Sequence, residues 1–456
     1  MTFEFEDRER HTRSPAHELA LSCLAAGIEA ARPERAIERH LSLSEDDDAD
    51  GDALGVRGET YDLAGFDRVL VLGGGKAAGG LARALEELLG DRIDGGAVVL
   101  DAPADLDRVE VHVGGHPVPD EGSVAGARRL LELARTADER TLVLAPITGG
   151  GSALLAAPAE GISLADLRAV TESLLASGAS IDELNAVRKH CSAIKGGGLA
   201  RAAGDATVVG LLVSDVVGDD PAVVASGPTA PDPSTFADAR AVLDRYGIDP
   251  PDAIRERIDR GVAGEFEETA DPDDPVFGRV SNQVLVGGHT AIEGAREVAE
   301  ERGYGAVLLS ARLRGEAVEA GLAHVAVAEE AVDTGEPVEP PGVVLSGGET
   351  TVTLGDDPGE GGPNQELALR AAIELPEGAV LASVDTDGRD GGSDAAGALV
   401  DASTVESGPG GDDAARDALA RHDAAPFLEA RGALLRSGRT GTNVNDLRVL
   451  VVTARG

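Results

Sequence analysis

Short runs of aliphatic residues alternate with amphipathic stretches along most of the chain. The runs at 66–72, 141–145 and 207–213 are almost wholly apolar, which is typical of strands buried on both faces. Helical periodicity follows them, most clearly from Ala77 to Leu89. This alternation predicts an α/β protein whose first sheet is mostly parallel, with ligands at the carboxyl edge of its strands.

The same alternation continues in the second half of the chain, which we expect to begin with a strand at 283–286. Further strands are predicted at 306–310, 342–345, 379–384 and 447–452. A stretch rich in Pro, Asp and Glu at 247–274 breaks the pattern and is predicted to be a linker. We therefore expect two domains, at 1–250 and 275–456.

Composition narrows the possible partners. The 456 residues are 42% hydrophobic but only 2% aromatic, so we expect cores of Ala, Val and Leu. A formal charge of −42 with so few aromatic rings argues against a nucleic-acid partner. The acid excess, with lysine almost absent, is typical of a halophilic protein in a salt-rich cytoplasm. No run approaches the roughly 18 apolar residues of a membrane span, so we expect a cytoplasmic protein with no membrane partner.

The chain has 40 Lys and Arg residues, and only Lys76, Lys189 and Lys195 are lysines. Ser180 and Glu183 form a predicted capping box that begins a helix near Ile181. Helical spacing through this stretch places four polar residues on one edge, and Lys189 on the opposite side: Asn185, Arg188, Ser192 and Lys195. The edge predicts contacts to phosphate or carboxylate, with Lys195 as a catalytic candidate. The alternative is a set of solvated lysines on a helix that ends at glycines.

Two glycine-rich turns follow predicted strands and could bind anions through free backbone N–H groups. The first contains Gly74, Gly75 and the catalytic candidate Lys76. The second contains the phosphate-contacting candidates Gly150, Gly151 and Ser152. The alternatives are tight packing of the turns and a loose dinucleotide fingerprint, Gly73-x-Gly75-x-x-Ala78 with Asp101 as ribose ligand.

Carboxylates also follow strands in both halves. Asp385, Asp387 and Asp390 lie in one loop whose spacing fails the EF-hand pattern but suits magnesium, which needs fewer protein ligands. The alternative is an acidic turn in an acidic protein. Asp215 could orient or deprotonate an acceptor hydroxyl. Glycine turns, scarce lysines and carboxylates together favour phosphoryl transfer, although the chain has no P-loop motif and no Gly-x-Ser-x-Gly elbow.

Many ordered blocks of the sequence resemble the glycerate 2-kinase family that carries a C-terminal MOFRL domain, some of whose members are labelled hydroxypyruvate reductase. The blocks are GGGKAAGGLA at 73–82, GGHPVPDEGS at 114–123, TGGGSALL at 148–155, NAVRKHCSAIKGGGLA at 185–200, SDVVGDDPAVVASGPT at 214–229, GGET at 347–350, NQELAL at 364–369, DTDGRDGGSDAAGA at 385–398 and TGTNVNDL at 440–447. Within these blocks, further candidates for substrate or phosphate contacts are Glu349, Thr350, Asn364 and Gln365.

The resemblance implies two three-layer α/β/α domains that face a cleft, the first of them Rossmann-like, and a MOFRL region at about 340–456. It also implies ATP, Mg²⁺ or another divalent cation, and phosphoryl transfer to the 2-hydroxyl of D-glycerate, which gives 2-phosphoglycerate. Lys76 matches an essential lysine of that family. The residues alone leave open a 3-phosphoglycerate product, the preferred nucleotide and metal, and whether the chain forms a homodimer.

The chain departs from the family pattern at one cation. Pro363 stands where the family often has an arginine, whereas Arg389 lies in the acid loop, where a small or apolar residue is common. We hypothesise that the guanidinium has moved between the two loops, which makes Arg389 a catalytic candidate. Two other functions stay open: an NAD(P)H-dependent hydroxypyruvate reductase and a non-enzymatic nucleotide sensor.

Overall fold

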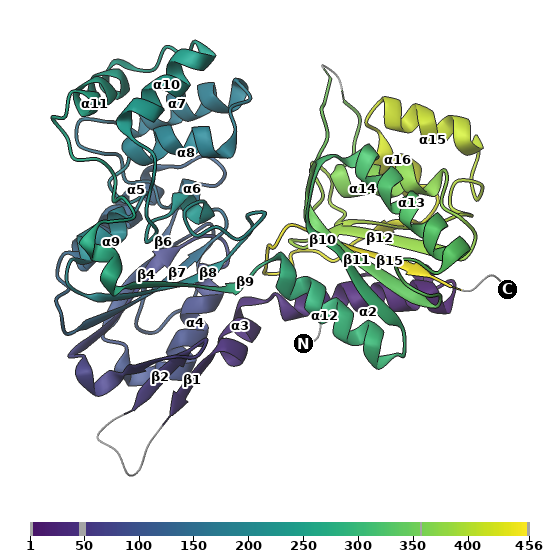
Figure 1. Cartoon of the computed structure of the whole chain (residues 1–456), viewed down its shortest axis with the longest axis horizontal. Helices are drawn as coiled ribbons and strands as arrows, with labels where there is room; N and C mark the ends of the chain where they lie inside the picture. Colours follow the sequence, from purple (N-terminus) through teal and green to yellow (C-terminus); the bar gives the residue numbers. More distant parts are fainter. Residues whose placement is uncertain (1–2, 45–51, 356–357, 454–456) are drawn as a thin grey trace. The chain divides into compact units, whose positions relative to one another are not determined.

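The structure is a computed structural model that describes residues 3–44, 52–355 and 358–453. The chain divides into two compact units. The parallel-sheet unit comprises residues 36–285, and the mixed-sheet unit comprises residues 1–35 and 286–456. Each unit is built around its own six-stranded sheet (Figure 1).

The sheet of the parallel-sheet unit has the order β6-β5-β4-β7-β8-β9, and neighbouring strands from β6 to β8 pair in parallel. Its strands are β4 (Arg68–Gly74), β5 (Gly95–Leu100), β6 (Glu110–Val113), β7 (Thr141–Thr148), β8 (Thr207–Val213) and β9 (Val280–Val286). Every residue of β7 is buried, as expected for a strand covered on both faces. The predicted parallel sheet is thus confirmed.

Helices cover both faces of this sheet. Figure 1 shows α4 (Ala78–Leu89) on one face and α5 (Glu121–Ala134) and α9 (Gly198–Ala203) on the other. A separate helical layer has a core of its own, which includes Phe236; it consists of α7 (Leu164–Ala176), α8 (Ile181–His190), α10 (Phe236–Tyr246) and α11 (Asp252–Val262). A small antiparallel sheet precedes β4, and its strands are β1 (Leu41–Ser44), β2 (Ala53–Val56) and β3 (Glu59–Asp62).

The sheet of the mixed-sheet unit has the order β10-β11-β15-β12-β13-β14. Only β10 and β11 pair in parallel, and the other neighbours are antiparallel. The strands are β10 (Gly305–Glu316), β11 (Gly342–Thr351), β12 (Ala379–Asp385), β13 (Gly397–Asp401), β14 (Leu434–Leu435) and β15 (Asp446–Val452). The helices are α2 (Pro15–Ala30) and α12 (Gly288–Glu301) on one face, and α13 (Ala317–Thr334), α14 (Pro363–Ala372), α15 (Gly411–Ala420) and α16 (Ala424–Glu429) on the other (Figure 1).

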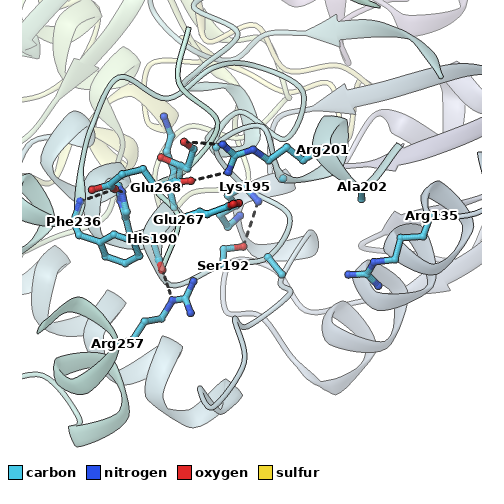
Figure 2. Close-up of a pocket in the computed structure, with 15 residues that line it drawn as sticks. Arg135, His190, Ser192, Lys195, Arg201, Ala202, Phe236, Arg257, Glu267 and Glu268 are labelled. Atoms are coloured by element: carbon cyan, nitrogen blue, oxygen red, sulfur yellow. Dashed lines mark hydrogen bonds and ion pairs between the residues drawn. The ribbon is translucent and has the colours of Figure 1, made fainter. Parts of the chain in front are cut away.

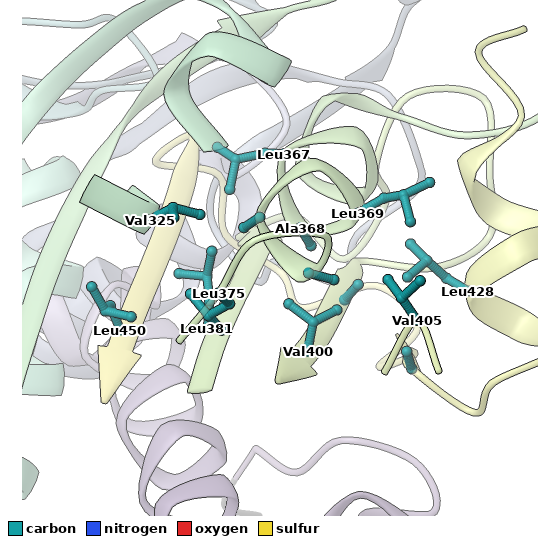
Figure 3. Close-up of a cluster of buried hydrophobic side chains, with 14 of the residues drawn as sticks. Val325, Leu367, Ala368, Leu369, Leu375, Leu381, Val400, Val405, Leu428 and Leu450 are labelled. Carbon is teal, nitrogen blue, oxygen red and sulfur yellow. The ribbon is translucent and has the colours of Figure 1, made fainter. Parts of the chain in front are cut away.

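The core beneath α13 and α14 is aliphatic, as the composition predicts. Figure 3 shows Leu367 and Leu369 of α14 in one buried cluster with Leu381 of β12, Val400 of β13 and Leu450 of β15. All five side chains are no more than 1% exposed. Packing of Leu, Val and Ala therefore fixes α14 over the sheet, and α14 carries the candidates Asn364 and Gln365 at its first turn.

The expected domain boundaries need two corrections. The first concerns the N-terminus, because residues 1–35 belong to the mixed-sheet unit and not to a domain spanning 1–250. Helix α2 is buried nearly all round, with Leu21, Leu24 and Ile28 fully covered, since it lies between the sheet and α12. Thr442 Oγ1 also donates a hydrogen bond of 2.6 Å to Ala31 O.

The second correction concerns the predicted linker at 247–274. Ile254 and Ile258 of α11 are buried in the core around Phe236, so the stretch belongs to the parallel-sheet unit. The strand expected to open the second half is β9, which instead completes the first sheet beside β8. The acidic residues that suggested a linker lie mainly on the exposed side of this layer.

The described helices include none that is long and apolar enough to cross a membrane.

Candidate active site

The turn after β4 and the turn after β7 lie at the carboxyl edge of the parallel sheet and are hydrogen-bonded to each other. Lys76 N donates to Gly149 O at 2.8 Å, and Ala77 N donates to Thr148 Oγ1 at 3.1 Å. Gly75 has φ +130°, and a Cβ on it would lie 2.2 Å from Thr148 Oγ1. Gly75 N also donates to Val99 O at 3.0 Å, so these backbone N–H groups are not free to form the anion cradle predicted at the first turn. The glycines there allow close packing, which was the alternative interpretation.

The second turn has the free N–H groups. Among the described residues, Gly150 N and Gly151 N donate to no acceptor. Gly150 has φ +81°, and a Cβ on it would lie 2.9 Å from Lys76 Cγ and 3.2 Å from His116 Cδ2. The Lys76 and His116 side chains thus pack against this bare turn. An ammonium group beside unpaired N–H groups is the arrangement that binds phosphate.

The carboxylate of Asp215 lies beside the same turn as Lys76 and His116. A Cβ on Gly149 would lie only 2.1 Å from Asp215 Oδ2, so Asp215 packs directly on the turn. Burial raises the pKa of Asp215, while the charge of nearby Lys76 lowers it. The structure thus brings together two predicted residues that are 139 positions apart, Lys76 and Asp215. A carboxyl with a raised pKa is suited to accept a proton from a hydroxyl.

Sequence reasoning missed His116 as a site residue. It follows β6, and its ring lies against Gly150 beside Lys76. The signal was present in the sequence, since the carboxyl ends of parallel strands meet at one edge of a sheet and His116 comes three residues after such a strand.

A second polar group adjoins the first through Ser152. Lys195 Nζ donates to Ser152 O at 2.8 Å, and the hydroxyl oxygens of Ser152 and Ser226 lie 3.1 Å apart. Ser226 Oγ donates to Asn185 Oδ1 at 2.9 Å. Three of the predicted contacts, Asn185, Ser152 and Lys195, therefore belong to one hydrogen-bonded chain.

The second group is strongly cationic. Lys195 is 6% exposed, and no described carboxylate pairs with it. Burial first, and then the charges of Arg188 and Lys189, lower the pKa of Lys195 to about 7. Arg188 is half-buried, and its side chain makes no hydrogen bond or ion pair with the residues that the structure describes. Burial alone lowers the pKa of its guanidinium.

The helix bearing this group ends earlier than predicted. The Ser180–Glu183 capping box is confirmed, and α8 begins at Ile181, but it ends at His190. Beyond it, Ala193 N donates to Ala157 O, and Ser192 Oγ accepts from Lys195 N. These bonds replace the helical ladder, so Lys195 reaches the site from a loop.

Lys189, which helical spacing predicts on the side opposite the cationic edge, is buried. It is 5% exposed, and its Nζ lies 3.2 Å from Asp232 Oδ1. Asp232 is 2% exposed and also accepts hydrogen bonds from Ser234 and Thr269. Lys189 is therefore the counter-ion of a buried carboxylate, and its role is structural.

A cavity of about 290 Å³ is lined in part by Ser192 and Lys195 of the loop after α8 (Figure 2). Several of its polar lining residues bond to one another: His190 Nε2 lies 3.0 Å from Glu268 Oε2, and Arg257 Nε donates to His190 O at 2.6 Å. Arg201 Nη1 donates to Glu268 O at 2.6 Å. These bonds hold the segment around Glu268 against the end of α8 and thereby fix the loop that follows.

In the mixed-sheet unit, the acid loop does not hold its three carboxylates as one metal site. Asp390 accepts hydrogen bonds from Asn364 N at 3.0 Å and Gln365 N at 2.8 Å, so it caps α14. Both carboxylate oxygens of Asp390 are thus engaged in hydrogen bonds, and its role as a metal ligand stays a prediction. Asp385 and Asp387 remain, and burial followed by the charges of Asp387 and Asp446 raises the pKa of Asp385 well above its ordinary value. Within the described ranges, no group of three or more His, Cys, Asp or Glu side chains is arranged to hold a metal ion.

A buried network next to this loop takes up several other predicted residues. Asp446 accepts from Thr350 N at 3.0 Å and from Asn364 Nδ2 at 2.6 Å, and it pairs with Arg448. Arg448 is fully buried and was not predicted, because its position in β15 carries no motif. Gln365 Nε2 donates to Ser393 Oγ at 2.6 Å. Glu349 and Arg389 are exposed at the ends of β11 and of the acid loop.

Comparisons with known proteins agree with this arrangement. Residues 19–259 match the family described as a domain of unknown function, DUF4147, and residues 342–446 match the MOFRL family. The chain is 40% identical over 442 residues to glycerate 2-kinase of Pyrococcus horikoshii, covering 96% of this chain and 98% of that one. It is 42% identical over 395 residues to an Agrobacterium vitis protein provisionally named hydroxypyruvate reductase, covering 84% and 87%. The crystal structure of glycerate kinase from Thermotoga maritima superposes with a TM-score of 0.83 at 37% identity, covering 96% of this chain and 99% of that one.

The two buried lysines should respond differently to substitution. Lys189→Met leaves Asp232 buried without its cation, so we expect a loss of about 3–5 kcal/mol in the free energy of unfolding. Lys195→Met removes a cation that has no carboxylate partner and one hydrogen bond, so its stability should stay within about 1 kcal/mol of wild type. Urea unfolding of both variants measures this. Equal losses would contradict the assignment of Lys189 to structure and Lys195 to the site.

Lys195 should also make stability depend on pH. Its folded pKa is about 7 and its ordinary value is 10.5, so between these values the unfolded chain holds a proton that the folded chain lacks. Its contribution to the unfolding free energy therefore rises with pH in that window, by about 1.4 kcal/mol per unit, and is lowest below about pH 7. The difference between wild type and Lys195→Met, measured by urea unfolding at about pH 7.5 and about pH 8.5, should shift by that amount. A constant difference would show that Lys195 keeps its ordinary pKa.

Proposed function

The chain belongs to the glycerate 2-kinase family, and from that premise we propose that it transfers the γ-phosphoryl group of ATP to the 2-hydroxyl of D-glycerate. The observation that carries the proposal is full-length similarity to glycerate 2-kinase combined with Lys76, Asp215 and a free glycine turn at one point of the parallel sheet. Phosphoryl transfer is catalysed mainly by positioning and by stabilising negative charge, and these groups supply both.

Each group has a distinct part in the proposed reaction. The Lys76 ammonium and the N–H groups of Gly150 and Gly151 bind the oxygens of the transferred phosphoryl group and stabilise the charge that develops there. Asp215 accepts the proton of the attacking hydroxyl, and burial favours its protonated form after transfer. Lys76 stabilises the ionised form before transfer, so the pair is balanced between the two states.

A divalent cation fits the acid loop through Asp385 and Asp387. The repulsion that raises the pKa of Asp385 is relieved by a bound cation, and its Oδ2 accepts no hydrogen bond from a described residue. When bound, Mg²⁺ would neutralise phosphate charge, for which one or two protein carboxylates are enough.

A nicotinamide-dependent hydroxypyruvate reductase is the second candidate, because a relative carries that provisional name. The fingerprint glycines that favoured it have another explanation, since a Cβ on Gly73 would lie 1.9 Å from Pro146 O. Absorbance at 340 nm with hydroxypyruvate and NAD(P)H separates the two activities, and turnover of ATP dismisses a nucleotide sensor.

Lys76→Met should lower kcat by at least about tenfold, because removing 1.4 kcal/mol of transition-state stabilisation has that effect. ADP release with D-glycerate measures the rate, and phosphorus NMR of the product distinguishes 2- from 3-phosphoglycerate. Arg83→Met, an exposed change on the following helix α4, is the matched control. A Lys76 variant as fast as this control would refute the role of Lys76.

Arg389→Ala tests whether the cation missing at Pro363 has moved to the acid loop. If it has, kcat/KM for D-glycerate should fall by much more than twofold, since a smaller change corresponds to less than about 0.5 kcal/mol. Arg416→Ala, on exposed α15 of the same unit, is the control. A change within twofold would mean that the chain manages without this arginine.

A further inference from the structure

Three donor side chains lie near Ser152, and two of them, Asn185 Nδ2 and Arg188, have no acceptor among the described residues. Asn185 and Arg188 stand one turn apart on α8, so their side chains share a face. Asn185 Nδ2 is buried and has no hydrogen-bond partner among the described residues. Arg188 has none either, and Lys195 uses a single bond, to Ser152 O.

Leaving such groups unpaired is costly. A buried donor without an acceptor costs about 1–3 kcal/mol, and a buried cation without a counter-ion costs more. The same chain shows how it treats a cation with a purely structural role, since Lys189 has Asp232 as its counter-ion. Arg188 and Lys195 lack one, although the sequence has 82 Asp and Glu residues. A bound anion would supply the counter-ion that Arg188 and Lys195 lack.

The position of the group indicates which anion it takes. Gly150, beside Lys76, and Ser152, bonded to Lys195, are two residues apart, so their backbones are separated by at most about 7 Å. A phosphoryl group at Lys76 and an anion beside Lys195 would therefore lie at neighbouring positions of one turn, and Arg188 is near enough to Lys195 for its charge to act on that ammonium. A planar guanidinium with an amide N–H beside it matches a carboxylate, which accepts two parallel hydrogen bonds.

We propose that Arg188 and Asn185 bind the carboxylate of a small 2-hydroxy acid and select it against neutral alcohols. Lys195 is a positioning residue in this arrangement: it holds Ser152 and adds positive charge near the same anion. The proposal rests on the proposed kinase function, whose phosphoryl site lies at Lys76, and adds to it the part of the substrate that the enzyme recognises.

The test compares D-glycerate with D-glyceramide, in which an uncharged amide replaces the carboxylate. Wild type should strongly prefer the acid in kcat/KM. Arg188→Gln should reduce the ratio of the two values by at least about tenfold, as expected for a lost charge-assisted hydrogen bond, while KM for ATP stays within about twofold. A merely structural role for Arg188 would slow both substrates equally. Arg188→Lys should restore part of the preference, and Arg240→Gln, an exposed change on α10, should leave it unchanged.

Arg188→Gln removes an unpaired cation, so it should fold, and its thermal unfolding serves as a check. If it does not fold, Arg188→Lys and Asn185→Ala supply the comparison. An acid-to-amide ratio within twofold of wild type would overturn the proposal. If wild type forms no ADP with D-glycerate, the kinase function is wrong, and calorimetric titration with D-glycerate then decides the inference by itself: binding lost in Arg188→Gln supports it, and unchanged binding overturns it.

Discussion

The candidate site depends on how the turn after β4 packs against the turn after β7. The N–H groups of Lys76 and Ala77 are spent on Gly149 O and Thr148 Oγ1, and this leaves the N–H groups of Gly150 and Gly151 free. The N–H groups of the turn after β4 therefore hold the turn after β7 in place. The Lys76 side chain packs against the turn after β7, whose N–H groups stay unpaired. Because bare glycines make this contact possible, a methyl group at position 75 or 149 would separate the ammonium, the N–H groups and Asp215 at once.

The buried cations likewise fall into two groups, those with a carboxylate counter-ion and those without one. The fold neutralises Lys189 with Asp232 and Arg448 with Asp446, and it leaves Lys195 and Arg188 without counter-ions at the neighbouring site. Stability is therefore lower there than it could be, which is usual where binding or catalysis needs preorganised charge. The lowered pKa of Lys195 reflects this loss of stability, since it arises from burial and from the charges of two nearby cations.

Much of the fold and of the candidate site could be predicted from the sequence, wherever the signal is local or follows from sheet topology. The capping box at Ser180 fixed the beginning of α8, and the rule that ligands gather at the carboxyl ends of parallel strands placed Lys76 near Asp215. The predictions that were wrong depended on tertiary competition. Helical spacing could not show that Ala157 O would accept a hydrogen bond from Ala193 N. Loop composition could not show that Asp390 would cap α14. Composition suggested a linker at 247–274, because acidic exposed faces of packed helices resemble linkers.

The chain has a net charge of −42, so the distance over which its charges act on an anionic substrate matters for binding. At about 1 M salt the Debye length is near 3 Å, so the acidic surface neither repels an anionic substrate at a distance nor stabilises a distant cation. At low salt the repulsion returns and opposes the approach of anions. Contacts made inside the protein are screened far less in either solvent. Recognition built from half-buried Arg188 and buried Asn185 and Lys195 therefore keeps its strength where surface electrostatics vanishes, which a patch of exposed lysines could not do.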